Sequence, residues 1–141
     1  MTTLEKAISI SLDAHKGQND KSGLPYILHP LRVMLKMDTT EEMIPAVLHD
    51  VLEDTQVDQS FLLTEGIPDN LVNIVISLSR KEGEDYLSYI KRIKPNPIAA
   101  KIKLADITDN ANILRLTEVD NADLERLNNY LQAIRILSGR K

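Results

Sequence analysis

The sequence predicts an all-α protein, and three observations support this fold class. Apolar residues recur at helical spacing along most of the chain, whereas the alternation typical of a half-buried strand is scarce. Two Thr-x-x-Glu segments match the capping box that opens helices. Proline and glycine stand near the expected helix starts and ends. With 141 residues, 43% of them hydrophobic, the chain fits a single helical-bundle domain over residues 1–141.

The first half of the chain is predicted to form three helices and one long loop. A capping box opens the first and third helices, and a proline begins the second. The predicted elements are a helix over residues 3–16, a polar loop over 17–28, a short helix over 30–37 and a longer helix over 40–54. Loops as long as this one are often functional in small domains.

The second half of the chain is predicted to be helical as well. A short amphipathic segment around residues 61–63 is closed by Gly66. Asn96 and Pro97 have the residue types preferred at the cap and first position of a helix, and Gly139 is placed to stop the last helix. The predicted helices cover residues 68–78, 85–93, 97–106 and 120–137.

Composition limits the class of function. The chain has no cysteine, so any metal site must use His, Asp and Glu. A net charge of −4 without a basic block argues against a nucleic-acid partner. The N-terminus does not resemble a signal peptide, and no apolar run approaches the roughly 20 residues that span a bilayer. We therefore expect a cytoplasmic protein without a membrane partner, and its oligomeric state stays open.

The adjacent pair His49 and Asp50 is the most informative feature of the chain. It lies in an apolar stretch and is followed by two carboxylates, Glu53 and Asp54. Burying unpaired carboxylates costs several kcal/mol each, so a helix that served only packing would not carry them here. In the predicted helix, each member of the first pair lies four residues before a member of the second, so all four share one flank.

Two further residues can complete a metal site. His29 precedes Pro30 in an apolar segment, and Asp106 follows the sequence Lys-Leu-Ala. With His49 and Asp50 they offer two imidazoles and two carboxylates, a set suited to one divalent ion of the Mn, Fe or Zn type. The remaining histidine, His15, is interpreted as a packing or loop-anchoring residue.

Four segments of the chain resemble a known family. They are Ala14-His15-Lys16-Gly17-Gln18, Lys21-Ser22-Gly23-x-Pro25-Tyr26-Ile27-x-His29-Pro30, Leu48-His49-Asp50-Val51-Leu52-Glu53-Asp54-Thr55 and Lys103-Leu104-Ala105-Asp106. In this order and spacing they resemble the HD-domain metallophosphohydrolases. The resemblance is greatest to the Rel/Spo-type hydrolases of the alarmone ppGpp in their stand-alone form, the small alarmone hydrolases, and it runs from about residue 14 to residue 130.

The resemblance implies a fold, a cofactor and a set of site residues. The fold is a single-domain HD-type helical bundle, and the activity is Mn²⁺-dependent hydrolysis of the 3′-pyrophosphate of a guanosine-type alarmone. No synthetase domain follows in the sequence, so only hydrolysis is expected. Asn110 matches a family residue near the substrate ribose. The implied Mn²⁺ ligands are His29, His49, Asp50 and Asp106, and the implied water-activating residues are Glu53 and Asp54.

Other residues are candidates for binding the nucleotide substrate. Positioning and charge neutralisation dominate phosphoryl transfer, so basic side chains are expected around the phosphates. Lys21 and Lys103 are the leading candidates. For Lys103, a phosphate contact and an ordinary surface lysine are equally good interpretations. Tyr26 and Tyr130 are the expected aromatic contacts to the nucleoside, and bundle packing is the alternative for both. Arg80 and Lys81 fit an exposed charged stretch better than a phosphate site.

Two departures from the family pattern leave the substrate base open. Asp20 stands where the alarmone hydrolases usually carry an arginine, and residues 107–110 read Ile-Thr-Asp-Asn instead of Arg-Leu-His/Tyr-Asn. One alternative is therefore an HD hydrolase for (p)ppApp or for another phosphorylated nucleotide such as NADPH. A second alternative is a sensor that binds a nucleotide without turnover, although a sensor has no need of Glu53 and Asp54. No role is assigned to Asp109.

Overall fold

The computed structural model describes residues 1–139, and in this part of the chain the regular structure is helical. The α-helices are α1 (Thr3–Ala14), α2 (Leu28–Leu35), α3 (Thr40–Val47), α4 (Val51–Asp54), α5 (Gln59–Thr64), α6 (Asp69–Leu78), α7 (Tyr86–Ile93), α8 (Pro97–Asn110) and α9 (Asn121–Ser138). A 3₁₀ turn, η1 (Ile113–Arg115), lies between α8 and α9. Over these residues the chain contains no strand, only one isolated bridge between Asn19 and Pro25. The predicted all-α class is confirmed.

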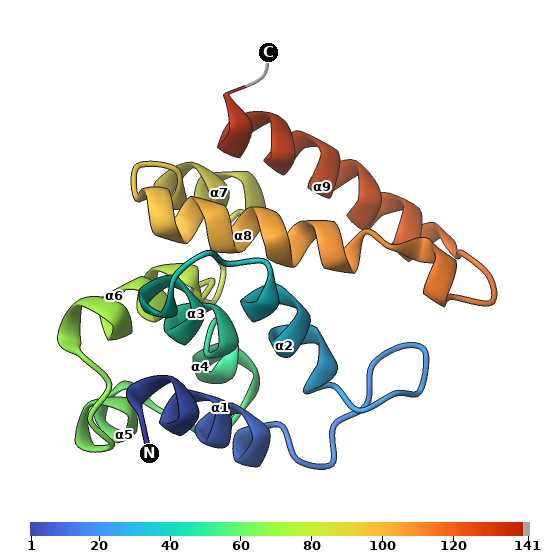
Figure 1. Ribbon diagram of the computed structural model, residues 1–141. Coiled ribbons are helices and arrows are strands. Elements are labelled where there is room, and N and C mark those ends of the chain that lie inside the picture. Colours follow the sequence, from blue (N-terminus) through green and yellow to red (C-terminus); the bar gives the residue numbers. More distant parts are fainter. Residues whose placement is uncertain (140–141) are drawn as a thin grey trace.

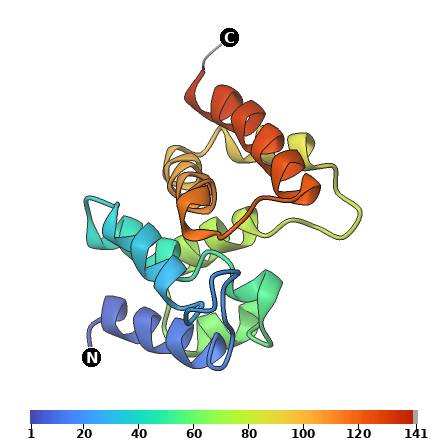
Figure 2. The same ribbon diagram turned by 90° about the vertical axis from the view of Figure 1, so that its right-hand side faces the viewer.

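Helix α8 is the central element of the bundle (Figures 1 and 2). It packs against α2, α3 and α6 on one side and against α9, which also packs on α7, on the other. Because it has neighbours on several sides, its buried residues do not form a single stripe, and they include Ala99, Ile102, Ala105 and Ile107. Residues on different sides of α8 can therefore face either half of the bundle.

The core around α8 is expected to be sensitive to truncation. Ile102 is fully buried at 0% exposure, so Ile102→Ala leaves a cavity and should lower the free energy of unfolding by about 2–5 kcal/mol. Leu124 on α9 is 52% exposed, and Leu124→Ala should change that free energy by no more than about 0.5 kcal/mol. Urea denaturation of both variants measures the difference, and similar losses would contradict this assignment of the core.

Several predicted helix ends are confirmed. In both capping boxes the threonine accepts a hydrogen bond from the backbone N–H three residues later, and the glutamate accepts one from the threonine N–H (Thr2 with Glu5, Thr39 with Glu42). Asn96 caps α8 through two backbone N–H groups. Gly139 ends α9 at φ +72°, a conformation that side chains with a Cβ rarely adopt.

The predicted continuous helix over residues 40–54 is wrong. Helix α3 ends at Val47, a turn follows at residues 48–50, and α4 begins at Val51. In a helix with 3.6 residues per turn, neighbouring side chains point about 100° apart, whereas His49 and Asp50 lie here in the turn between the two helices. The His49 Nδ1 lies 2.8 Å from the Ala46 carbonyl at the end of α3, and the same carbonyl accepts the His49 backbone N–H at 3.3 Å.

The remaining differences between the predicted and the observed helices are smaller. Helix α2 begins at Leu28, two residues before Pro30, so the proline lies within the first turn, where a missing N–H is tolerated. Helix α8 continues past Asp106 to Asn110, and η1 was not predicted.

Among residues 1–139, no helix combines the length and the apolar character that crossing a membrane requires.

Candidate metal centre and nucleotide pocket

The loop between α1 and α2 delivers the first site residues. Its two arms are joined by backbone hydrogen bonds from Asp20 N–H to the Leu24 carbonyl and from Tyr26 N–H to the Gln18 carbonyl, both 2.8 Å. Gly23 makes the reversal at φ +85°. The chain then enters α2, whose first turn holds His29 buried at 4% exposure. The ordered loop therefore sets the position of a histidine that would otherwise lie at the end of a flexible segment.

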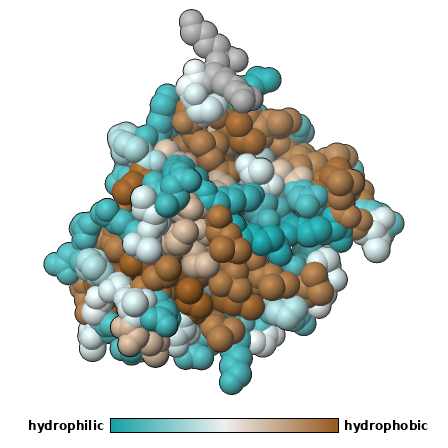
Figure 3. Space-filling view, in the orientation of Figure 1, coloured by the Kyte–Doolittle hydropathy of each residue, from teal (hydrophilic) through white to brown (hydrophobic). Residues whose placement is uncertain are grey.

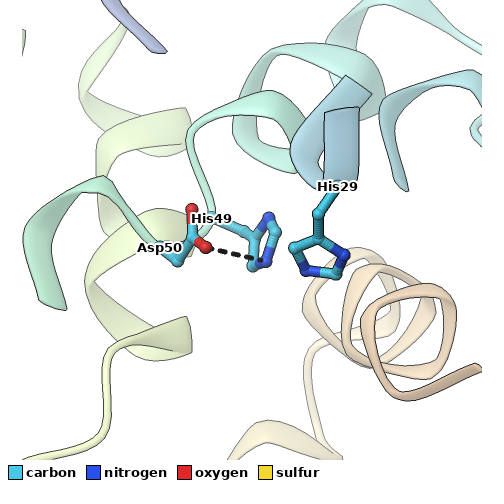
Figure 4. A group of neighbouring side chains, drawn as sticks. All are labelled: His29, His49 and Asp50. Atoms are coloured by element: carbon cyan, nitrogen blue, oxygen red, sulfur yellow. Dashed lines mark ion pairs between the residues drawn. The ribbon is translucent and has the colours of Figure 1, made fainter. Parts of the chain in front are cut away.

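The predicted metal ligands come together from three parts of the chain: α2, the turn between α3 and α4, and α8. One atom each from His29, His49 and Asp50 lies within 4.8 Å of the others, and Figure 4 shows both imidazole rings facing the same space. The Oδ1 atom of Asp106 lies 2.8 Å from His29 Nε2 and 3.3 Å from His49 Nε2. Asp50 Oδ2 lies 3.7 Å from His49 Nε2. All these residues are buried.

The protein contacts of the two imidazoles suit a cation between them. The Nδ1 of His49 contacts the Ala46 carbonyl, and the Nδ1 of His29 contacts the Asp109 carboxylate at 2.6 Å. Both Nδ1 atoms have an acceptor and can carry a hydrogen, which leaves each Nε2 able to bind a cation in the space shared with Asp50 and Asp106. Two neutral imidazoles and two carboxylates form a set that holds Mn²⁺, Fe²⁺ or Zn²⁺.

The charges of this cluster also favour a bound cation. Burial opposes protonation of His49, but the adjacent Asp50 and Asp106 carboxylates outweigh it and raise the pKa of His49 to about 9. Burial also opposes ionisation of Asp106, yet Lys103 and the two histidines hold its pKa well below the usual range. The carboxylates thus stay ionised and draw a positive charge into the cluster. A divalent ion can replace the proton that His49 otherwise carries.

Asp50 is held in place by two neighbours from the N-terminal part of the chain. The Tyr26 hydroxyl donates to its Oδ2, and His15 Nε2 lies 3.1 Å from its Oδ1. The other ring nitrogen of His15 contacts the Gln18 side chain in the loop at 2.9 Å. His15 therefore links the loop to Asp50, in agreement with its interpretation as a loop-anchoring residue.

Asp109 is a site residue to which the sequence analysis assigned no role. It is buried at 7% exposure, and its Oδ2 contacts His29 Nδ1. Arg32 donates to both of its oxygens, at 2.8 and 3.1 Å, and Arg115 donates to its backbone carbonyl at 2.5 Å. A carboxylate behind a metal-binding histidine fixes the ring orientation and increases its basicity. The sequence offered one signal for this role, the position of Asp109 one helical turn beyond Asp106. The contact with His29 could not be predicted because the two residues are 80 positions apart in the sequence.

We expect Asp109→Ala to weaken metal binding without removing it. The variant loses the hydrogen bond that orients His29, and loss of such a partner typically costs about 10–100-fold in metal affinity. Titration of the metal-free protein with Mn²⁺, followed by calorimetry, measures the change. Asp120→Ala, which removes the cap of α9 instead, is a control carboxylate that should leave the Mn²⁺ affinity unchanged. An unaltered affinity in Asp109→Ala would contradict this positioning role.

Two neighbouring cavities lie at and beside the cluster. The smaller, of about 190 Å³, is lined by His49, Asp50 and Asp106. The larger, of about 670 Å³, lies within the usual size range of small-molecule sites. Both cavities are lined by Tyr26, Asp54 and Asn110. In the orientation of Figure 1, the space-filling view in Figure 3 shows hydrophilic residues gathered across the middle of the molecule, with hydrophobic areas above and below.

Glu53 and Asp54 lie at the rim of the smaller cavity, on α4. Both are exposed, but partial burial against the cavity wall raises the pKa of each. Neighbouring carboxylates add to the effect: Asp54 raises the pKa of Glu53, and Asp50 raises the pKa of Asp54. A carboxylate with a raised pKa is a stronger proton acceptor, which suits a general base.

The predicted substrate-binding residues divide between the two cavities. Lys21 and Tyr130 line the larger one, Lys103 lines the smaller one, and Tyr26 and Asn110 line both. Lys103 is not a surface lysine, because its side chain is 14% exposed and its Nζ lies 2.8 Å from Asp106 Oδ2. The Asn110 side chain donates to Asp106 Oδ1 at 3.1 Å.

Four basic residues remain to be placed as candidates for phosphate binding. Lys21 and Arg126 both pair with Asp123 at the wall of the larger cavity, so the structure adds Arg126 to the candidates. Arg80 and Lys81 line neither cavity. Arg80 instead lies over the Tyr86 ring, 5.5 Å from its centroid.

The helical bundle and its His-Asp cluster define the chain as an HD-type protein, and comparisons with known proteins identify the branch. No family model matched the chain. It is 30% identical over 123 residues to the guanosine-3′,5′-bis(diphosphate) 3′-pyrophosphohydrolase of Aquifex aeolicus, covering 79% of this chain and 18% of that protein. It is 33% identical over 127 residues to the bifunctional (p)ppGpp synthase/hydrolase SpoT of Escherichia coli K12, with the same two shares. The chain belongs to the HD-type Rel/Spo hydrolase family.

A solved structure supports the fold independently. The structure of a metazoan orthologue of SpoT that hydrolyses ppGpp superposes with a TM-score of 0.79 at 20% sequence identity. The match covers 99% of this chain and 85% of that one. The curated relatives are much longer proteins, of which this chain spans about a fifth, 18% in the two cases above.

Proposed function

We propose that the chain is a Mn²⁺-dependent phosphohydrolase that removes the 3′-pyrophosphate from guanosine tetraphosphate and pentaphosphate alarmones. The observation that carries this proposal is the convergence of His29, His49, Asp50 and Asp106 beside a cavity of nucleotide size. The naming of its relatives as ppGpp 3′-pyrophosphohydrolases supports the substrate. The proposed partner is the nucleotide alone, without nucleic acid or membrane, and the proposed location is the cytoplasm.

The four residues of the cluster would hold the divalent ion. Bound there, such an ion polarises a phosphoryl oxygen and lowers the pKa of a coordinated water from about 15.7 toward 7. The chain's own contribution begins with orientation: Asp109 and the Ala46 carbonyl hold the two imidazoles, and Tyr26 holds Asp50. A preorganised cluster needs little rearrangement when the substrate arrives.

Glu53 and Asp54 would manage the protons of the reaction. In their raised-pKa environment, Glu53 accepts a proton from the attacking water. Asp54 borders both cavities, so its carboxyl group can orient the water or hold the proton of the leaving oxygen. In the proposed reaction the water oxygen forms a bond to the phosphorus that is attached to the ribose 3′-oxygen. The bond between that phosphorus and the 3′-oxygen breaks, the 3′-oxygen takes up a proton and stays on the ribose as a hydroxyl, and pyrophosphate is released.

Basic and aromatic residues would bind the rest of the nucleotide. Lys103 lines the smaller cavity as a half-buried cation, and Lys21 and Arg126 line the larger one. Their charges offset those of the substrate phosphates, which is most of what phosphoryl transfer requires of a protein. Tyr130 and Tyr26 offer aromatic faces to the nucleoside, and Asn110 lines both cavities.

A substrate screen tests the proposal. The purified protein is stripped of metal, reloaded with Mn²⁺ and assayed for pyrophosphate or phosphate release from ppGpp, ppApp and NADPH, with metal analysis in parallel. We expect Mn²⁺-dependent pyrophosphate release that is fastest from ppGpp. Faster release from ppApp or NADPH would move the assignment to that nucleotide. Bound Mn²⁺ without release from any of the three would favour a nucleotide sensor.

A further inference from the structure

The larger cavity has two distinct ends. Its near end is bordered by the residues shared with the metal cavity, including Asp54 and Asn110. Its far end is formed by the loop between α1 and α2, at Asp20, and by the segment around η1, at Asn112 and Arg115, none of which lines the metal cavity. In Figures 1 and 2 this loop lies beside the turn that contains η1. A nucleotide whose 3′-pyrophosphate lies at the near end can extend either its base or its 5′-diphosphate toward the far end, and the carboxylate of Asp20 there favours the uncharged base.

The two oxygens of Asp20 have different environments. Oδ1 accepts three hydrogen bonds from its own loop, from Ser22 N–H (2.9 Å), Ser22 Oγ–H (2.7 Å) and Leu24 N–H (3.0 Å). Within residues 1–139, no hydrogen bond or ion pair reaches Oδ2, although Asp20 lines the cavity. One oxygen therefore builds the loop, and the other is an anionic acceptor available to a ligand.

The chemistry of Oδ2 selects between purine bases. The Watson–Crick edge of guanine presents two adjacent donors, the N1–H and the 2-amino group, and a carboxylate oxygen can accept from both. The corresponding edge of adenine presents one amino group beside the lone pair of ring N1, which repels a carboxylate. Inosine keeps the N1–H but lacks the 2-amino group. A fixed carboxylate at the base end of a cavity therefore favours guanine, then hypoxanthine, then adenine.

We propose that Asp20 is the base-reading residue of this chain and that its Oδ2 accepts hydrogen bonds from the N1–H and 2-amino groups of guanine. The inference rests on the proposed function for the placement of the nucleotide. In the sequence analysis, an aspartate in place of the family's arginine supported the alternative of (p)ppApp or another phosphorylated nucleotide; here the same residue supports guanine. The same carboxylate that departs from the family pattern supplies guanine specificity by another chemical route.

Two single substitutions distinguish the roles of the two Asp20 oxygens. Asp20→Asn keeps an Oδ1 acceptor for the loop hydrogen bonds but replaces the free oxygen by an amide donor. Ser22→Ala is the matched control, because it removes one hydrogen bond to Oδ1 and leaves Oδ2 unchanged. Circular dichroism and thermal unfolding of both variants report on the loop and the fold.

The measurement is equilibrium binding of guanosine, inosine and adenosine 3′,5′-bis(diphosphates), by calorimetry without divalent metal. In the unsubstituted protein we expect guanosine to bind at least about tenfold more tightly than adenosine, with inosine between them, as charge-assisted hydrogen bonds allow. Asp20→Asn should weaken guanosine binding by about tenfold or more and alter adenosine binding by less than about threefold. Ser22→Ala should keep the preference for guanosine.

The contrary outcomes are distinct. Equal binding of guanosine and adenosine by the unsubstituted protein, an unchanged preference in Asp20→Asn, or an equal loss in Ser22→Ala would each overturn the role of Asp20. Pyrophosphate release is assayed separately with Mn²⁺. If guanosine preference depends on Asp20 but no pyrophosphate is released, the proposed hydrolysis is refuted and the base-reading role of Asp20 stands. If pyrophosphate is released without that preference, the hydrolysis stands and the role of Asp20 is refuted.

Discussion

His49→Ala is expected to abolish both metal binding and pyrophosphate release. The substitution removes one of two imidazoles from a buried cluster, and Asp50 and Asp106 then face each other with less compensating charge. Metal catalysis contributes several kcal/mol of transition-state stabilisation, so activity on ppGpp should fall on the order of 10³-fold or more. Metal analysis of the purified variant and a Mn²⁺-dependent release assay measure the two losses together.

His15→Ala is the informative comparison for that variant. His15 is also a buried histidine, but its ring contacts Asp50 and Gln18 and lines neither cavity. We expect this variant to retain bound Mn²⁺, with an affinity about 10–100-fold lower because Asp50 loses one of its supports. If His49→Ala bound Mn²⁺ as tightly as His15→Ala, the cluster would not be the metal site.

Features set by local sequence were predictable. The capping boxes at Thr2 and Thr39 act within a few residues, and so does the glycine that ends α9, so their patterns identify the helix ends directly. The candidate ligands were found for a related reason: imidazoles and carboxylates in apolar stretches are too costly to bury without compensation. The chain has only three histidines, which kept the possible combinations few.

Features set by distant contacts were not predictable. The helical pattern on either side of residues 48–50 indicates one helix, whereas the structure has a turn there, in which His49 contacts His29 on α2 and Asp106 on α8. Asp109 acquires its role from His29 and Arg32, 80 and 77 residues away in sequence. The role of Asp20 likewise depends on the cavity that its loop forms with η1. Spacing along one helix carries no information about such partners.

Glu53→Gln is expected to separate the chemical step from metal binding. Glu53 lines the smaller cavity but makes no contact with His29 or Asp106 within hydrogen-bond distance in the described chain, so the variant should keep its Mn²⁺. Loss of a general base typically lowers kcat by about 10²–10⁴-fold. The KM for ppGpp should change little, because the basic residues that face the phosphates remain.

The pH dependence provides a check that a structural role for Glu53 would not reproduce. Partial burial and the adjacent Asp54 raise the pKa of Glu53, so the base is lost by protonation as the pH falls through that pKa, and kcat should fall with it. In Glu53→Gln the residual rate should lack this acidic decline. Glu82→Gln, an exposed substitution outside both cavities, should retain the full rate and the original profile. An unchanged acidic decline in Glu53→Gln would assign the base to Asp54, whose pKa is raised in the same direction.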